Sequence, residues 1–109
     1  MNVVTKIEEI KKACTDAHGV FDKDQFRIRI VLLQLEFHFE GVSINEYYSD
    51  INKQLFRFLG PGHNLASCIQ FMHGKKGQAI LNRVKQDIFK DMSPTLTKEM
   101  LRSILHSEN

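Results

Sequence analysis

The sequence of this 109-residue chain is poor in the residues that cross-link or break up a fold. It has two cysteines, two prolines and six glycines, and it has no tryptophan. A scaffold held by several disulfides is therefore excluded, and a disordered chain rich in proline and glycine is not indicated. Cys14 and Cys68 are expected to be free thiols, because a chain without export signals usually resides in a reducing compartment.

The sequence also lacks a long hydrophobic run. No apolar run reaches the roughly 18 residues that are needed to span a bilayer. Polar side chains interrupt the most hydrophobic stretch, at Arg27, Arg29, Gln34, Glu36 and His38. The first residues, MNVVTKIEEIKK, carry acidic side chains where a signal peptide has its apolar segment. We therefore expect a cytoplasmic protein.

Motifs for catalysis and metal binding are missing as well. There is no Gly-x-Ser-x-Gly element, and neither cysteine has a base that the sequence identifies as its neighbour. His63, Cys68 and His73 are spaced five residues apart, which on a helix turns successive groups by about 140° and prevents them from converging on one ion. Asp22 and Asp24 lack the following ligands of a calcium loop and are better explained as helix caps. We expect neither an enzyme nor a metal or cofactor site.

The most informative segment that is present is QFRIRIVLLQLEFHFEG, residues 25–41. Apolar residues alternate with polar ones at both ends of this segment, first at Phe26, Ile28 and Ile30 and then at Leu35, Phe37 and Phe39, as in a β-strand. However, a strand of some 15 residues far exceeds the usual five or six. Val31, Leu32 and Leu33 also break the alternation, and no other segment of the chain has a strand pattern that could pair with this one.

On a helical wheel the same segment has two apolar stripes on opposite sides. One stripe contains Phe26, Ile30, Leu33 and Phe37, and the other contains Ile28, Leu32, Leu35 and Phe39. This pattern predicts a central helix over residues 25–40 that is covered on two sides, with Asp22 or Asp24 as its cap and Gly41 as its end. The alternative is a strand that a partner chain completes, which would make an obligate dimer.

The remaining segments also have helical spacing. Capping boxes at Thr5–Glu8 and Ser43–Glu46 predict helix starts, Gly19 and Gly60 predict helix ends, and Asn64 is a further cap. After residue 43 the apolar spacing runs through Ile44, Tyr48, Ile51, Leu55 and Phe58. Two more helices are expected over residues 78–92 and 93–105. The sequence thus predicts an all-α protein, a compact bundle of five or six helices in a single domain, residues 1–109.

A basic stretch suggests nucleic-acid binding. The net charge of +2 is too small to indicate this alone, but residues 75–90 contain five basic residues against one acid, Asp87: Lys75, Lys76, Arg83, Lys85 and Lys90.

A segment that overlaps this basic stretch, GKKGQAILNRV, resembles the Gly-x-x-Gly loop of KH domains, with Gly74, Gly77 and Ile80 in similar places, over about a tenth of the chain. The resemblance implies a loop that contacts phosphates. KH domains also contain a three-stranded sheet, whereas residues 85–109 have a helical pattern, so we consider residues 64–92 as a helix-turn-helix-like region.

Aromatic residues suggest a different function. Eight phenylalanines and two tyrosines are many for a core of this size. Four of them crowd one predicted helix, at Tyr47, Tyr48, Phe56 and Phe58, and we predict these as contacts to another protein; core packing is the alternative. The first functional hypothesis is a non-enzymatic interaction module, such as an adaptor, inhibitor or regulator, that also self-associates as a homodimer. The second is a nucleic-acid-binding regulator that uses the basic stretch.

Overall fold

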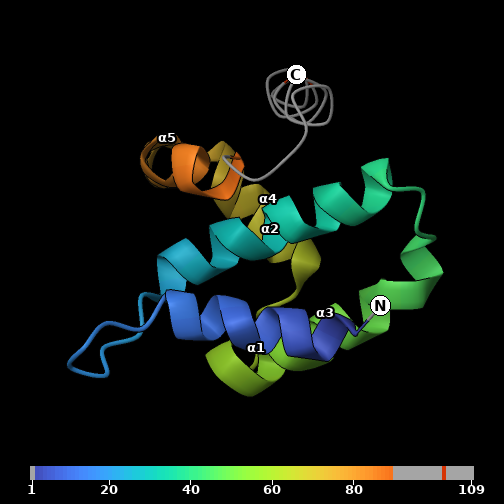
Figure 1. Cartoon of the computed structure of the whole chain (residues 1–109), viewed down its shortest axis with the longest axis horizontal. Coiled ribbons are helices and arrows are strands. Elements are labelled where there is room, and N and C mark those ends of the chain that lie inside the picture. The colour runs from blue at the N-terminus through green and yellow to red at the C-terminus, as the bar shows by residue number, and fades with distance from the viewer. Residues whose placement is uncertain (1, 90–101, 103–109) are drawn as a thin grey trace.

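The computed structural model of the protein describes residues 2–89 and residue 102, and the part it describes is helical (Figure 1). In chain order the helices are α1 (Val3–Ala13), α2 (Lys23–Phe39), α3 (Ile44–Leu59), α4 (Leu65–His73) and α5 (Lys75–Phe89). The described residues contain no strand, only one isolated β-bridge. The prediction of a compact all-α bundle is confirmed. Of the helix predicted over residues 93–105, only Arg102 is among the described residues.

Residues 25–39 of the stretch whose pattern allowed a strand or a helix belong to helix α2. Asp22 is the N-cap, and its side chain accepts a hydrogen bond from the backbone N–H of Gln25 at 3.0 Å. The helix ends before Gly41, whose φ of +82° belongs to a region that suits glycine. The helix prediction is therefore confirmed, and the strand alternative is wrong.

Helix α2 lies in the middle of the bundle, with α1 and α3 on one side and α4 and α5 on the other (Figure 1). Side chains of both predicted stripes are buried: Phe26, Ile28, Ile30, Val31, Leu32, Leu33 and Phe37. Leu35 and Phe39 are partly buried against this core. Burial of each such side chain contributes about 1.5–3 kcal/mol. Two covered sides explain why the polar residues of α2 are confined to the narrow gaps between the stripes.

Helix α1 differs from its prediction at both ends. It begins at Val3, because the side chain of Asn2, not that of Thr5, is the cap and accepts from the N–H of Thr5 at 3.0 Å. It ends at Ala13 instead of continuing towards Gly19. Asp16 turns the chain by accepting from the N–H groups of His18 and Val20 at 2.8 and 2.9 Å. This local hydrogen bonding competes with helix formation.

Ser43 and Asn64 cap α3 and α4 as predicted, but Ser43 accepts from Asn45 and does not form the predicted capping box with Glu46. Ser43 precedes α3 and accepts from the N–H of Asn45 at 3.3 Å, and Gly60 with φ +91° ends this helix. Asn64 and Ser67 form a reciprocal capping box at the start of α4. The sequence could predict these caps because a cap depends only on residues within one helical turn of it.

Candidate functional site

Helix α3 has a buried face and an exposed face, and its tyrosines lie on different ones. Tyr47, Ile51 and Leu55 are buried against the core, while Tyr48 is 41% exposed and Phe56 is 61% exposed. The core stripe passes through Tyr47, Ile51 and Leu55, so the predicted stripe is confirmed at Ile51 and Leu55 and is wrong at Tyr48. The two adjacent tyrosines differ by about 100° around the helix, which is enough to place only one of them in the core.

Tyr47 is a core residue. Its ring lies 5.1 Å from that of Phe37 on α2, and its hydroxyl oxygen accepts a 3.5 Å hydrogen bond from Nε2 of Gln34. Because it is 1% exposed, Tyr47 has no surface to offer a partner. For this residue the structure corrects the prediction of an interface contact in favour of the core alternative.

The side chain of Phe58 is partly buried against the core. Its ring contacts that of Phe26 edge to face, with ring centroids 5.8 Å apart. On its outer side the cations of Lys11 and Arg57 lie 5.3 Å and 4.7 Å from the ring centroid. The ring thus supports the α1–α3 contact, and two cations cover the part that faces outward.

The exposed part of α3 forms a shallow depression between its two exposed rings. Tyr48 and Phe56 line it together with Ser49, Asn52 and Lys53. Asn52 is held in place, because its Oδ1 accepts a 2.9 Å hydrogen bond from the N–H of Leu65, the first residue of α4. We call these five residues the α3 surface. It combines apolar rings with a polar group fixed by the fold, which is a usual composition for a protein contact.

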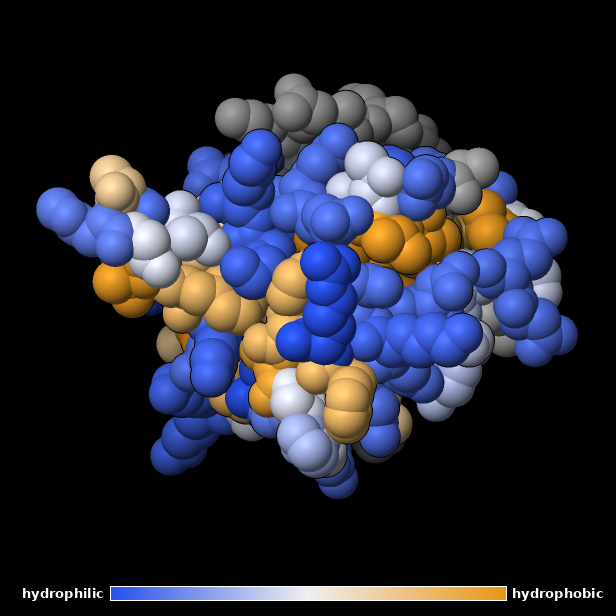
Figure 2. Space-filling view, turned by 90° about the horizontal axis from the view of Figure 1, so that it is seen from below, coloured by the Kyte–Doolittle hydropathy of each residue, from blue (hydrophilic) through white to orange (hydrophobic). Residues whose placement is uncertain are grey.

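A view of the molecule from below shows how apolar side chains are distributed on that face. The hydrophobic residues, coloured orange, lie there in separate areas with hydrophilic side chains between them (Figure 2). The large hydrophobic residues that the structure leaves exposed are Val20, Tyr48 and Phe56. Val20 lies by itself in the loop between α1 and α2, whereas Tyr48 and Phe56 share one depression. Among the described residues, the α3 surface therefore differs from the rest of the surface in having two exposed aromatic rings, Tyr48 and Phe56, side by side in one depression.

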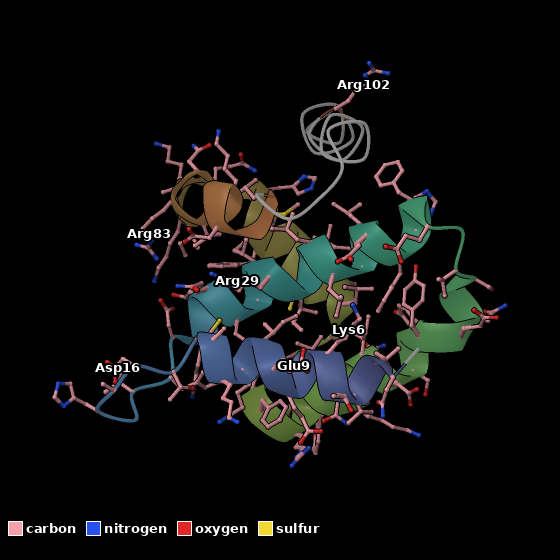
Figure 3. The ribbon with its side chains drawn as sticks, in the orientation of Figure 1. Lys6, Glu9, Asp16, Arg29, Arg83 and Arg102 are labelled. Atoms are coloured by element: carbon pink, nitrogen blue, oxygen red, sulfur yellow. The ribbon has the colours of Figure 1, made fainter. Side chains whose placement is uncertain are left out.

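The predicted basic region is partly neutralised by acids from another helix. Nζ of Lys76 lies 2.8 Å from Oδ2 of Asp24, and Nη2 of Arg83 lies 3.8 Å from Oδ2 of Asp22. In Figure 3 the labelled Arg83 side chain points from α5 towards the start of α2. The hydrogen bond from Lys76 is the main reason that the pKa of Asp24 is lowered from its usual value. Of the five predicted phosphate contacts, Lys76 is thus engaged within the protein, and Arg83 forms a longer and weaker surface pair.

The other basic residues are placed differently. Lys75 is exposed at the start of α5, and Lys85 donates to Oδ1 of Asn82 at 3.4 Å. Lys90 lies outside the described residues. The sequence pattern did not predict the acids at the start of α2 that pair with Lys76 and Arg83.

The Gly-x-x-Gly stretch is not a loop between helices. Helix α5 begins at Lys75, so Gly77 lies inside its first turn and is buried. A Cβ at Gly77 would be 2.1 Å from the carbonyl oxygen of Phe71, whereas at Gly74 the nearest atom would be 3.5 Å away. Nε2 of Gln78 donates to the carbonyl oxygen of Met72 at 2.8 Å. The glycine therefore serves the close contact of α4 with α5.

Both cysteines are free and buried. Burial raises the pKa of the Cys14 thiol to about 11, and burial raises the pKa of Cys68 as well. Cys14 donates a 3.7 Å hydrogen bond to Oε1 of Gln25, which also accepts from Nε of Arg29 at 2.8 Å. A raised thiol pKa disfavours the thiolate, so neither group is prepared for nucleophilic chemistry.

The described residues contain no group of three or more His, Cys, Asp or Glu side chains that could hold a metal ion. In the same part of the chain, every helix is too short or too polar to cross a membrane. The chain matches no protein-family model, and no curated protein and no solved structure is similar to it.

Proposed function

We propose that this protein is a non-enzymatic interaction module of the adaptor, inhibitor or regulator kind, which acts in the cytoplasm and binds another protein through the α3 surface. The observation that carries the proposal is the shared exposure of Tyr48 and Phe56 around one depression. Aromatic residues are enriched in protein interfaces, because they bury much apolar area and have few rotatable bonds.

The fold supports the same assignment. Helix α3 is held by its buried face and by the Asn52 hydrogen bond to the start of α4. A contact surface on a fixed helix loses little conformational entropy when a partner binds. The depression is also shallow and open, which suits a helix or strand of another protein better than a small molecule, since small-molecule sites enclose most of their ligand.

Affinity capture with matched variants tests the proposal. The tagged full-length chain is compared with Phe56→Ser in extracts of the native cell, and captured proteins are quantified by mass spectrometry. We expect a protein that the unchanged chain retains to be reduced at least about tenfold with Phe56→Ser. Val20→Ser, which removes an equally exposed apolar side chain in the α1–α2 loop, is the control and should retain it. Equal capture by all three chains would refute the proposal.

Nucleic-acid binding remains the second hypothesis. It has less geometric support, because Lys76 and Arg83 already pair with Asp24 and Asp22. A phosphate that binds these two cations would compete with both carboxylates.

A further inference from the structure

The charged residues on the outer flank of α3 follow a regular order. Glu46, Asp50, Lys53 and Arg57 are separated by four, three and four residues, which places all four within an arc of about 60° around the helix. Glu46, Lys53 and Arg57 are exposed and Asp50 is half-buried. Along this flank, two acids occupy the first half of the helix and two bases occupy the second half.

Most of these charged side chains form no ion pair within the described part of the chain. Arg57 lies 3.7 Å from Oε2 of Glu8, and both side chains are about half exposed, so this is a weak surface pair. In residues 2–89, Glu46, Asp50 and Lys53 take part in none of the ion pairs. The flank therefore presents an acidic half and a basic half to whatever approaches α3.

Three pairs of residues on α3 are centred within half a residue of one another along the helix. Tyr48 and Phe56 lie equally far on either side of Asn52. The midpoint of Glu46 and Arg57, and that of Asp50 and Lys53, both fall between Ile51 and Asn52. If a second α3 helix is placed alongside in the opposite direction, each exposed ring therefore meets the other ring, and each acid meets a base.

We propose that the α3 surface binds a second copy of this chain, with the two α3 helices antiparallel about a two-fold axis that passes next to Asn52. The inference rests on the proposed function, since it names the partner of the same surface. A two-fold axis makes each contact occur twice. Tyr48 then packs against Phe56 of the second copy, Glu46 faces Arg57 of that copy, and Asp50 faces its Lys53.

The antiparallel direction follows from the charges. In an antiparallel two-fold pair the same flank of each helix meets its counterpart, so the acidic half of one chain lies along the basic half of the other. A parallel two-fold pair would instead set the charged flank of each copy beside the aromatic flank of the other, and would bury charge next to Tyr48 without an opposite charge. Only the antiparallel arrangement therefore satisfies both flanks.

The size of the contact sets its strength. A helix of 16 residues is about 24 Å long, so one helix pair gives an interface at the small end of the range for specific contacts. We expect a reversible dimer with a dissociation constant on the order of micromolar, weakened by salt because its charge pairs are at the rim.

Sedimentation velocity of the purified full-length chain at low salt, over a range from about 1 to 500 μM, tests this inference. The unchanged chain should shift from monomer to dimer with concentration. Lys53→Glu alone and Asp50→Lys alone should each raise the dissociation constant by about tenfold or more, since each change affects two symmetry-related pairs. The variant that carries both changes exchanges the charges and should restore the dimer. Lys75→Glu makes the same charge change as Lys53→Glu on exposed α5 and should leave the dimer intact.

The outcomes separate this inference from the proposed function. A chain that stays monomeric over the whole range overturns the second copy as partner, and so does a double variant that fails to restore the dimer while its circular dichroism spectrum matches that of the unchanged chain. If the purified chain is monomeric but Phe56→Ser still loses a captured protein from the extract, the inference fails and the proposed function stands. If dimerisation follows the charge pattern, the inference is supported whatever else the extract contains.

Discussion

The ammonium of Lys76 lies 2.8 Å from Oδ2 of Asp24 and joins the first turn of α5 to the first turn of α2. Asp24 also accepts from Nη1 of Arg27 at 3.2 Å. The carboxylate thus connects two helices that pack against each other, and it lies at the positive end of the α2 dipole, where negative charge is stabilising.

Asp24→Asn should lower the free energy of unfolding near pH 7 by about 1 kcal/mol, because it removes a partly exposed ion pair and a charge at a helix start. The pKa of Asp24 is lowered in the folded state from its ordinary 3.8, chiefly by the hydrogen bond from Lys76. The carboxylate therefore stabilises the fold above pH 3.8, and this contribution is lost as the pH falls through the lower folded value. Urea denaturation of both chains across this range measures the difference. Asp87→Asn, at an exposed acid of α5, is the control; a difference for Asp24→Asn that stays constant with pH would contradict the argument.

Gly77→Ala should destabilise the protein by about 1–3 kcal/mol, although alanine favours a helix over glycine by about 1 kcal/mol. The added Cβ would meet the carbonyl oxygen of Phe71 at 2.1 Å, so α4 and α5 must separate. Gly74→Ala is the matched control, because its Cβ would be at an ordinary 3.5 Å from that same oxygen. Thermal denaturation of the two variants should show a large loss for the first only, and equal losses would refute the close-contact role.

Tyr47→Ala and Tyr48→Ala should differ sharply although the residues are adjacent. Removing the buried ring of Tyr47 leaves a cavity beside Phe37 and should cost about 3–5 kcal/mol. Tyr48 is 41% exposed, and its removal should cost below about 1 kcal/mol. Equilibrium denaturation with urea gives both values. Similar losses for the two variants would show that the assignment of α3 faces is incorrect.

The thiols should react slowly in the folded protein. With its pKa raised to about 11 from 9.0, Cys14 has roughly a hundredfold less thiolate near pH 8 than an ordinary cysteine. Alkylation followed by mass spectrometry should therefore label Cys14 at least about tenfold more slowly than in urea, since the higher nucleophilicity of a high-pKa thiolate offsets part of this loss, and Cys68 should also be protected because it is fully buried. Rapid labelling of either residue in the folded state would contradict this.

Nucleic-acid binding can be tested with the two lysines at the start of α5. If the basic region binds DNA or RNA, Lys75→Glu with Lys76→Glu should abolish a salt-sensitive mobility shift. Because Lys76 is paired with Asp24, we expect Lys75→Glu alone to cause most of any such loss. No shift by the unchanged protein at low salt would end this hypothesis.

Much of the fold could be predicted because its signals are local. The caps Ser43 and Asn64 act within one helical turn, and the two stripes of α2 reveal a helix that is covered on both sides. The early end of α1 was missed because Asp16 forms a turn whose hydrogen bonds compete with the helix. The helix end was predicted at Gly19 because glycine commonly ends a helix, and this rule does not take account of the competing hydrogen bonds of Asp16.

The candidate site was predicted only in part. Tyr48 and Phe56 were identified as possible contacts, but Tyr47 and Phe58 were grouped with them, because crowding of aromatics along a helix does not reveal which ones face the core. The ion pairs of Lys76 with Asp24 and of Arg83 with Asp22 join residues far apart in sequence. Such pairs follow from the packing of α2 against α5, which a single sequence does not specify.

The hydrogen bond between Asn52 and the N–H of Leu65 gives the molecule a built-in reporter. One end of this bond belongs to the depression between Tyr48 and Phe56, and the other is the first amide of α4. Whatever fills the depression touches Asn52 and alters the environment of that amide. The nuclear magnetic resonance signal of the Leu65 amide should therefore move when the surface is occupied, before the identity of the occupant is known.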